Sequence, residues 1–544
     1  MAALLALFAC LCIAVSFSFS MLGSAAQRDA ASDRALAQAR EALIAYAAER
    51  PINAWVGPGY LPCPDLDDDG WAESTCGSQN GDSGQESRLG RLPWKTLGLP
   101  DLRDGYGERL WYAVSSKHKG LLNCGASRAC IDMTPDSAIG TISVRDSSGL
   151  LMHDGTSTDL YAVDRSGALA VVIAPGPRIA RLAPGAGLST LEQQRECGPL
   201  ECDAAGRCLL DPPMRVAKCH PANYLDKAPE GRYAGEDNAD FVDRSDTAGR
   251  ARNTNGFIQG PVFTPAGTIA VNDRIAVIAY RDLMPRVMRR VAVEVAHCLV
   301  DYAARPENAG RYPTPSPICR QDSSDASVAW ADGEGIAFGR IPDTPFTRTR
   351  EASGGRMLDR WWRSSARSPE ILSELPTRDR ACRIAYEPLD EGPARTSPAG
   401  TPSDEGRTAG LAENAWWTYW KPFVFYALAP AMRAGTSAAA CDASSCISVV
   451  DADGAAIAGG KAFAVIVSGS PLELRASPQR HGVGLSRVSD WLEGANAALE
   501  TANPNPPAPQ CAFDPSRAAC AGDCLRVAQG ARSAAFNDVL ATGP

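Results

Sequence analysis

The sequence predicts an α+β fold in which a long N-terminal helix is followed by two tandem heads, each a helix packed on an antiparallel sheet. Three observations lead to this prediction. A set of landmarks recurs in the same order in the two halves of the 544-residue chain. An apolar N-terminal run leads into an alanine-rich segment that lacks glycine and proline between residues 24 and 50. Short β-type runs, separated by proline- and glycine-rich turns, follow each predicted helix.

The repeat rests on seven matched landmarks. The first is the end of each predicted helix, where ALIAYAAERP stops at Pro51 and HCLVDYAARP stops at Pro306. The other six pairs, in chain order, are residues 90–93 with 339–342, 110–114 with 424–428, Cys124/Cys130 with Cys441/Cys446, 170–173 with 464–467, 224–226 with 491–493, and 272–276 with 537–541. Seven matches in one order predict two copies of one fold. We expect a membrane segment at 1–24, a first domain at 25–280 and a second at 281–544.

The predicted elements follow from residue patterns in each copy. Residues 25–50 and 281–305 show helical spacing of apolar side chains, and Pro285 is tolerated because it falls in the first turn of the second helix. The β-type runs are predicted at 109–114, 139–145, 159–163 and 168–174 in the first copy, and at 423–427, 446–450 and 462–468 in the second.

The N-terminal segment predicts a membrane anchor. Residues 1–27 carry no charged side chain, and an apolar core of about 21 residues is long enough, as a helix, to cross a bilayer. The alternative is a cleaved signal peptide, for which the small residues at 24–26 would form the cleavage site.

Composition excludes some functions. A formal net charge of −9 at pH 7 and an isoelectric point near 5.3 argue against a nucleic-acid partner, which favours a basic surface. None of the five histidines lies in a zinc-protease motif, and neither a nucleophile elbow nor a phosphate-binding loop occurs, so we expect no enzyme. A nucleophile formed by Cys298 with His297 is the alternative, and a helix-packed cysteine with a disulfide partner is favoured over it.

Eighteen cysteines predict disulfides formed in an oxidising compartment. Most of those in the body of the chain lie in close pairs. The candidate pairs are Cys63/Cys76, Cys124/Cys130, Cys197/Cys202, Cys208/Cys219, Cys298/Cys319 and Cys441/Cys446. Zinc is the alternative at Cys520/Cys524 and in the cluster from Cys197 to His220, but the spread of cysteine over the whole chain favours disulfides.

The strongest resemblance lies in the first copy. A long apolar helix that runs into ALAQAREALIAYAAERP is followed by YLPCPD at 60–65 and GRLPWKTLGLPDLRDGYGERLWYAVS at 90–115. This region resembles bacterial pilin-like and pseudopilin-like proteins of type IV pili and type II secretion. The resemblance is most specific over about residues 30–115, and the chain departs from the family pattern in having no glutamate before Glu41.

The resemblance implies two tandem pilin-like heads and a single-pass inner-membrane protein with periplasmic or cell-surface domains. It further implies a non-enzymatic minor or tip subunit whose partners are the inner membrane and other pilin-like subunits or secretion machinery proteins. The alternatives are an anchored or secreted adhesin that recognises a glycan or protein and, less favoured, a hydrolase with a site built from loops.

The acidic segment that begins at Asp65 is the candidate metal site. Aspartates at alternate positions followed by glycine can wrap carboxylates around a hard cation, so calcium is the one candidate cofactor, with the candidate ligands Asp65, Asp67, Asp69 and Glu73. The alternative is a solvated acidic turn closed by the Cys63/Cys76 disulfide. The shorter motif at 451–454 is predicted to be a hairpin turn.

An aromatic cluster at 416–420 marks a candidate partner surface in the second copy. We assign most of its side chains to the core, because the neighbouring Phe425 and Tyr426 match Trp111 and Tyr112 of the first copy. Trp416 and Trp420 remain the candidates for a surface that binds a partner.

Overall fold

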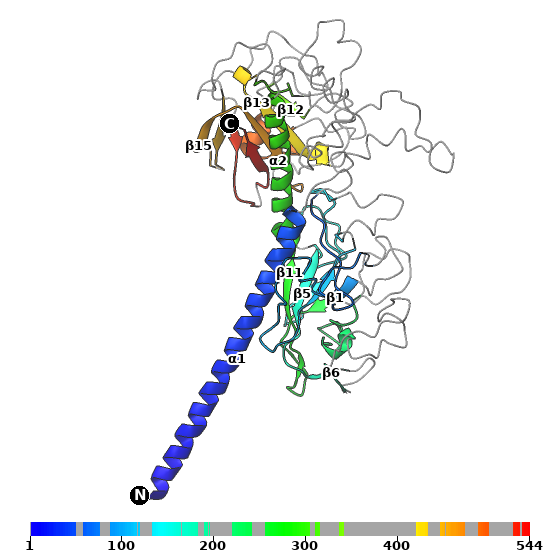
Figure 1. Cartoon of the computed structure of the whole chain (residues 1–544), viewed down its shortest axis with the longest axis vertical. Helices are drawn as coiled ribbons and strands as arrows, with labels where there is room; N and C mark the ends of the chain where they lie inside the picture. Colours follow the sequence, from blue (N-terminus) through cyan, green and yellow to red (C-terminus); the bar gives the residue numbers. More distant parts are fainter. Residues whose placement is uncertain are drawn as a thin grey trace, which may run out of the picture. The chain divides into compact units, whose positions relative to one another are not determined.

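The structure is a computed structural model (Figure 1), and its side chains are described from residue 25 onward. The residues that it describes are 2–49, 58–74, 76, 88–116, 118–119, 133–164, 166–182, 190–193, 195, 220–241, 256–304, 310–315, 337–341, 420–432, 446–451, 453–473, 488–499, 526–533 and 536–543.

Most of the described elements are strands in several small sheets, and three α-helices accompany them. The helices are α1 (Ala2–Glu49), α2 (Tyr280–Ala304) and α9 (Gly494–Ala498). The predicted α+β fold, with one helix on one antiparallel sheet in each head, is therefore wrong. The physical reason is that turns rich in proline and glycine interrupt the β-type runs after two to six residues, so that the strands are short and pair in several separate sheets.

In the part of the chain that the structure describes, no helix combines the length and the apolar character needed to cross a bilayer. The predicted transmembrane segment at 1–24 and the single-pass inner-membrane localisation are therefore wrong. A span needs about 20 consecutive apolar residues. The described side chains of α1, from residue 25 onward, include the charged groups Arg28, Asp29, Asp33, Arg34, Arg40, Glu41 and Glu49.

The chain divides into two compact units. The first comprises Met1–Ala47, Tyr60–Arg128 and Ile139–Asp282, and the second comprises Ala48–Gly59, Ala129–Ala138 and Leu283–Pro544.

Each unit contains a four-stranded antiparallel sheet with the same connectivity. In the first unit the order is β1-β2-β5-β11, and in the second it is β12-β13-β16-β18. The central strands are buried on both faces. The bounds are β1 Leu89–Arg91, β2 Trp111–Val114, β5 Ala170–Ala174, β11 Arg274–Ile278, β12 Phe338–Arg340, β13 Val424–Leu428, β16 Phe463–Val467 and β18 Val539–Thr542.

Each unit also contains a three-stranded sheet, and these sheets match as well. In both, the middle strand pairs antiparallel with one neighbour and parallel with the other. The two orders are β4-β3-β8 and β15-β14-β17. Their bounds are β3 Val144–Arg145, β4 Leu151–His153, β8 Phe257–Ile258, β14 Ile447–Val450, β15 Ala456–Lys461 and β17 Arg526–Ala528. The fold of the first unit is therefore repeated in detail in the second.

The hairpin turns of these sheets agree atom by atom. The carboxylate of Asp146 accepts the N–H groups of Ser148 and Leu150, and that of Asp451 accepts those of Asp453 and Ala455. The 451–454 motif is thus a hairpin turn, as predicted.

Two further pairs of strands lie in the first unit. They form the sheets β6-β7 and β10-β9. Their bounds are β6 Ala180–Leu182, β7 Thr190–Glu192, β9 Val262–Phe263 and β10 Ile269–Val271.

Most predicted strands contain a strand of the structure, with one exception. Residues 159–163 form a bend and a turn, in which the carboxylate of Asp159 accepts the N–H of Tyr161. The predicted second helix corresponds to α2, which begins one residue earlier and contains Pro285 near its start.

The sheet register also corrects one landmark. Trp111 lies opposite Ile173, and its counterpart Phe425 lies opposite Ile466, so residues 170–173 correspond to 463–466 rather than to 464–467. A slip of one residue exchanges the two faces of a strand, and two uniformly apolar runs carry no pattern that reveals it.

Candidate metal centre

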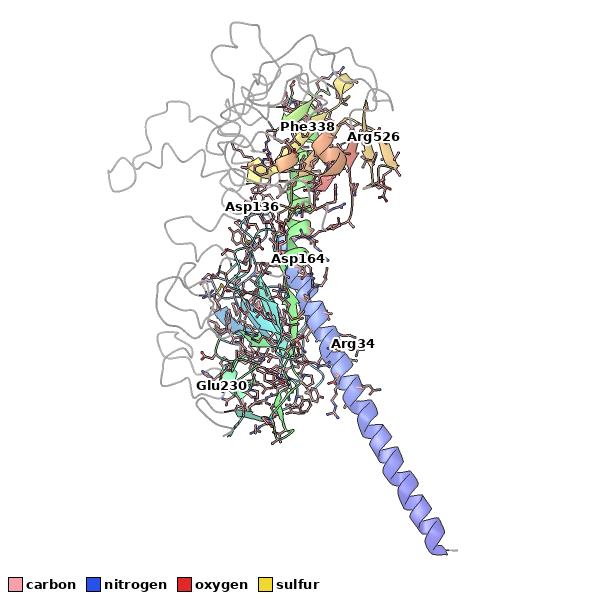
Figure 2. All side chains as sticks on the ribbon, turned by 180° about the vertical axis from the view of Figure 1, so that it is seen from behind. Arg34, Asp136, Asp164, Glu230, Phe338 and Arg526 are labelled. Carbon is pink, nitrogen blue, oxygen red and sulfur yellow. A yellow bond between two sulfur atoms is a disulfide. The ribbon has the colours of Figure 1, made fainter. Side chains whose placement is uncertain are left out.

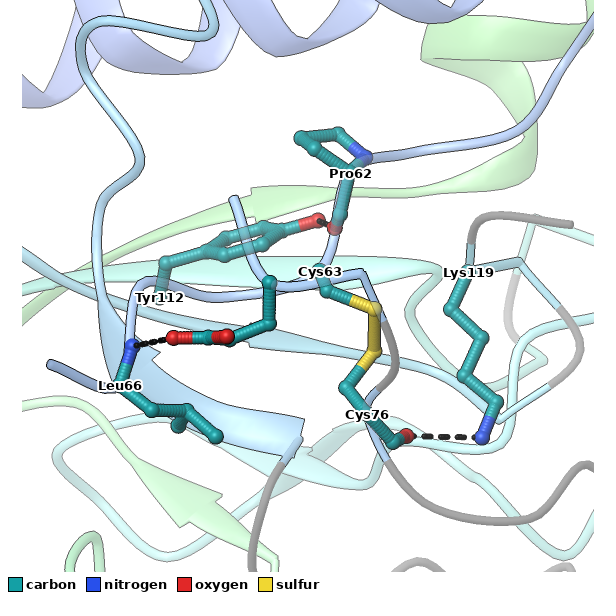
Figure 3. Close-up of a disulfide and its surroundings, with 7 residues drawn as sticks. Pro62, Cys63, Leu66, Cys76, Tyr112 and Lys119 are labelled. Atoms are coloured by element: carbon teal, nitrogen blue, oxygen red, sulfur yellow. Dashed lines mark hydrogen bonds between the residues drawn. A yellow bond between two sulfur atoms is a disulfide. The ribbon is translucent and has the colours of Figure 1, made fainter. Parts of the chain in front are cut away.

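The candidate metal site lies in a loop that is tied to the first sheet at several points (Figure 3). A disulfide joins Cys63 to Cys76, with 5.7 Å between the Cα atoms. The Nζ of Lys119 donates to the carbonyl of Cys76 over 2.8 Å, and the hydroxyl of Tyr112 donates to the carbonyl of Pro62 over 3.1 Å. These contacts hold the chain on both sides of the acidic segment.

Backbone pairing continues along the edge strand β1. The N–H of Asp65 donates to the carbonyl of Arg91 over 3.0 Å, and the N–H of Arg91 donates back over 2.7 Å. A Cβ at Gly90 would come within 2.7 Å of the carbonyl oxygen of Asp65. Glycine at this position therefore allows the loop to lie directly on the strand.

The loop separates its acidic side chains into two groups. One oxygen each from Asp65, Asp67 and Glu73 lies within 4.8 Å of the other two. Asp68 has a left-handed backbone, with φ of 62°, and forms an ion pair with Arg109 at 2.7 Å. Asp69, a predicted ligand, is not in the cluster.

The side chain of Asp69 is exposed and stabilises a turn. Its Oδ1 accepts the N–H of Trp71 over 2.7 Å and so closes the exposed turn. Three of the four predicted ligands therefore lie close together, and the fourth, Asp69, is used in the turn.

Asp65 is the buried member of the cluster. Its side chain is 1% exposed, and its Oδ2 accepts the N–H of Gly70 over 2.8 Å. Its Oδ1 has no hydrogen-bond partner among the described residues. Glu73 is half-buried, and its Oε1 accepts the N–H of Leu66 over 3.2 Å. Asp67 is also half-buried and accepts the N–H of Asp69 over 3.3 Å.

Burial is the main cause of the electrostatic cost of this arrangement. Burial, opposed by the N–H of Gly70 and reinforced by the neighbouring carboxylates of Asp68, Asp67 and Asp69, raises the pKa of Asp65 to about 7. Burial also raises the pKa of Glu73. The site therefore favours a bound positive charge over three free carboxylates.

The other predicted disulfide cysteines have varied outcomes. Cys446 is disulfide-bonded, and Cys298 is buried in α2. The rest lie outside the described residues, namely Cys124, Cys130, Cys197, Cys202, Cys208, Cys219, Cys319 and Cys441.

Of the two residues predicted to form a partner surface, the structure describes Trp420. Trp416 lies outside the described residues. Trp420 is 0% exposed, and its ring packs edge-on against Phe423 with 6.4 Å between the centroids. The assignment of Trp420 to a surface is therefore wrong, because its ring is part of the core.

The Cys298 and His297 nucleophile receives no support from the geometry. Cys298 is 5% exposed, whereas His297 lies on the exposed side of α2. Adjacent residues of a helix point in directions about 100° apart, so the imidazole and the thiol lie on different faces.

The sequence patterns missed one buried network that occurs in both units. In the first, Asn238 donates to Oδ2 of Asp273 over 2.8 Å and to the carbonyl of Ile258 over 3.0 Å. In the second, Asn496 donates to Oδ2 of Asp538 over 3.0 Å and to the carbonyl of Ala528 over 3.2 Å. The two aspartates belong to a matched landmark, which was the available signal, but the asparagines lie at different spacings along the chain.

A buried arginine is repeated in the same way. Arg91 lies between the rings of Trp111 and Tyr224, at 4.1 and 4.2 Å from the centroids. Arg340 lies between Phe425 and Trp491, at 3.7 and 5.1 Å. The matched Gly-Arg landmarks thus mark a structural position in each sheet.

Comparison with known proteins identifies no relative: no protein-family model matches the chain, and neither a curated protein nor a solved structure is significantly similar to it.

Proposed function

We propose that this chain is a non-enzymatic subunit of the pilin-like kind, which acts as a minor or tip component of a type IV pilus or a type II secretion pseudopilus. The proposal combines the resemblance of residues 30–115 with one structural observation, which is the way in which the first unit holds α1.

The described half of α1 has one face built into the first unit. Its buried apolar side chains are Ala35, Leu36, Ala39, Leu43, Ile44 and Ala47, none more than 7% exposed. Arg40 donates to the carbonyl of Val277 in β11 over 2.8 Å and forms an ion pair with Asp282 at 2.6 Å. The helix is therefore an integral part of the unit.

A second set of contacts holds the helix one to two turns earlier. The N–H of Gly105 donates to Oγ of Ser32 over 2.9 Å, and the hydroxyl of Tyr106 donates to Asp29 over 3.3 Å. The guanidinium of Arg274 in β11 forms an ion pair with Asp33 at 2.8 Å. These bonds fix the direction in which α1 leaves the sheet.

The opposite face of α1 is exposed and available to other subunits. Arg34, Ala37 and Gln38 are exposed, and Figure 2 shows the side chain of Arg34 projecting from the helix. In a filament built around helices, this face would meet neighbouring copies. The duplicated unit supports a minor or tip position, because a double head is bulky for a subunit that repeats along a fibre.

Photo-crosslinking along α1 tests the proposal in the native host. With p-benzoylphenylalanine in place of Ala37 or Gln38, we expect crosslinks to other pilin-like subunits. The same residue in place of Asp453, on an exposed hairpin turn of the second unit, is the matched control. Crosslinks at Asp453 alone, or none from α1, would contradict assembly through the helix.

A binding protein for a glycan or another protein is the second candidate. Met152 and Ile457 occupy equivalent positions in β4 and β15 and are 49% and 56% exposed. Exposed apolar side chains at the same point of both units favour a contact surface. Loss of ligand capture in a Met152→Asp, Ile457→Asp double variant, with α1 crosslinks unchanged, would select this candidate.

A further inference from the structure

The loop at 65–73 contains a carboxylate oxygen for which the described residues supply no partner. Oδ1 of Asp65 makes no hydrogen bond, although the side chain is 1% exposed. Burial of a carboxylate oxygen without a donor or a cation is costly, so such an atom points to a ligand that supplies positive charge.

The surrounding charges do not supply it. The nearby arginines form their ion pairs in this loop with Asp68, whose carboxylate lies 2.7 Å from Arg109 and 3.9 Å from Arg91. The Nζ of Lys95 donates to the main-chain carbonyl of Asp69. Asp65, Asp67 and Glu73 take part in no ion pair among the described residues. Their carboxylate oxygens nevertheless lie within 4.8 Å of one another.

We infer that the loop binds one Ca²⁺ ion through carboxylate oxygens of Asp65, Asp67 and Glu73. Two oxygens that share a Ca²⁺ ion at about 2.4 Å can lie at most about 4.8 Å apart, and the cluster meets this limit. All three donors are hard oxygen ligands, and neither sulfur nor imidazole belongs to the cluster, which disfavours zinc.

The shape of the loop favours calcium over magnesium. The three ligands come from an irregular turn that contains a left-handed residue, Asp68, and a left-handed glycine, Gly70. Ca²⁺ accepts six to eight oxygens in variable geometry, whereas Mg²⁺ requires a nearly regular octahedron at shorter distances. Main-chain carbonyls and water would complete the coordination.

The ion would stiffen the edge of the first sheet. Asp65 pairs with Arg91 of β1 through two main-chain hydrogen bonds, and the disulfide Cys63–Cys76 closes the loop around the cluster. Ca²⁺ at this position would link the two ends of the acidic segment and so hold β1 in place. This inference concerns the loop and is independent of the proposed assembly through α1.

Calorimetric titration with CaCl₂ tests the site on the full-length protein after removal of metal by EDTA. We expect one equivalent of Ca²⁺ to bind, with weaker binding of Mg²⁺. Asp65→Asn, Asp67→Asn and Glu73→Gln should each reduce the Ca²⁺ affinity at least about tenfold, because each removes one charged ligand.

The matched control lies in the same loop. Asp69→Asn removes the same charge from a side chain outside the cluster and keeps the oxygen that accepts the Trp71 N–H. It should change the affinity by less than about threefold. An equal loss in Asp69→Asn would show attraction by the acidic loop as a whole, and no saturable Ca²⁺ binding to the parent protein would overturn the site.

A folding defect cannot hide the result. Asp65 is in the core, so its substitution is monitored by near-ultraviolet circular dichroism. Asp67 and Glu73 are only half-buried, and their variants carry the test if Asp65→Asn misfolds. Unchanged Ca²⁺ affinity in folded Asp67→Asn and Glu73→Gln proteins would refute the assignment.

Discussion

The main-chain N–H of Asp226 donates to Oδ2 of Asp273 over 2.8 Å, and the same bond joins Glu493 to Asp538 over 3.0 Å in the second unit. All four acidic residues are buried, with at most 4% of each exposed. In each pair the second aspartate keeps an Oδ1 that makes no hydrogen bond with the described residues. Two neighbouring buried carboxyl groups hold a proton more readily than two isolated ones, so the arrangement in each unit favours a proton shared by the pair.

Stability should therefore fall as the pH rises. Burial raises the pKa of Asp226 to about 7, and burial and then Asp226 raise the pKa of Asp273 well above its ordinary value. Burial and then Glu493 raise that of Asp538. Because the folded state holds these protons more tightly than the unfolded state, the contribution of each group is complete below about pH 4 and is lost as the pH rises through its folded-state pKa, which is about 7 for Asp226, at about 1.4 kcal/mol per pKa unit.

The surroundings of the two pairs differ. Gln193 and Asn272 donate to Asp226, and the positive charges of Arg195 and Arg181 lower its pKa. The groups that lower the pKa of Asp538 are hydrogen-bond donors, the N–H of Glu493 and the amide of Asn496.

Urea unfolding of wild type and Asp273→Asn at pH 5 and pH 8 measures the effect. The variant cannot titrate at this position, so its free energy of unfolding should rise relative to wild type by about 1–4 kcal/mol between the two pH values. Asp453→Asn, at an exposed turn, is the control and should follow wild type. A difference between Asp273→Asn and wild type that does not vary with pH would contradict the shared proton.

Asn238→Ala should destabilise the first unit by about 2–4 kcal/mol, because it leaves the buried N–H and carbonyl of Ile258 without the amide that pairs with both. Asn496→Ala should do the same to the second unit through Ala528. Hydrogen exchange checks each variant, with faster exchange expected at β8 and at β17 respectively. Faster exchange at β17 in Asn238→Ala would contradict this local role.

Gly105→Ala should loosen α1 from the first unit. A Cβ at this position would lie 1.9 Å from the carbonyl oxygen of Arg28, so the helix or the loop must move. Limited proteolysis between Arg28 and Arg40 should become at least about threefold faster, an increase that corresponds to less than 1 kcal/mol. Gly459→Ala, where a Cβ meets no atom within 4 Å, is the matched control. Equal protection of α1 in both variants would show that the loop does not hold the helix.

Removal of the disulfide should lower stability. A Cys63→Ser, Cys76→Ser double variant opens a loop with a sequence separation of 13 residues and should lose about 2–4 kcal/mol in urea unfolding. Cys298→Ser is a control for the substitution of a buried cysteine outside this loop. If the double variant loses no more stability than the control, the disulfide contributes nothing to the folded state.

The repeat was predictable because the matched segments are local. Residues 110–114 and 424–428 share an apolar run that becomes the second strand of each sheet, and the hairpin turns at Asp146 and Asp451 use the same side-chain bonds. Such patterns act within a few residues and survive in the sequence. The division of the strands into several small sheets was not predictable, because it depends on which distant runs pair.

Even within the nine residues of the acidic loop, the sequence pattern predicted only part of the arrangement. The composition of the loop indicated a cation, but the alternation of aspartates placed Asp69 among the ligands. Asp68, which has a left-handed backbone, and Asp69, which accepts the N–H of Trp71, have side chains that lie outside the cluster. Half-buried Glu73 returns to the cluster because its main chain bonds to Pro64.

The sequence by itself determined that the chain repeats, where most of the repeated strands and turns lie, and that Cys63 and Cys76 are a candidate pair. These properties depend on patterns of neighbouring residues and on the order of those patterns along the chain. Only the tertiary structure decided the register of β5 and β16, the burial of Trp420, and the meeting of Asp226 with Asp273. The last pair lies 47 residues apart, and contact over such a distance is set by sheet pairing and by packing in the core, which no local pattern encodes.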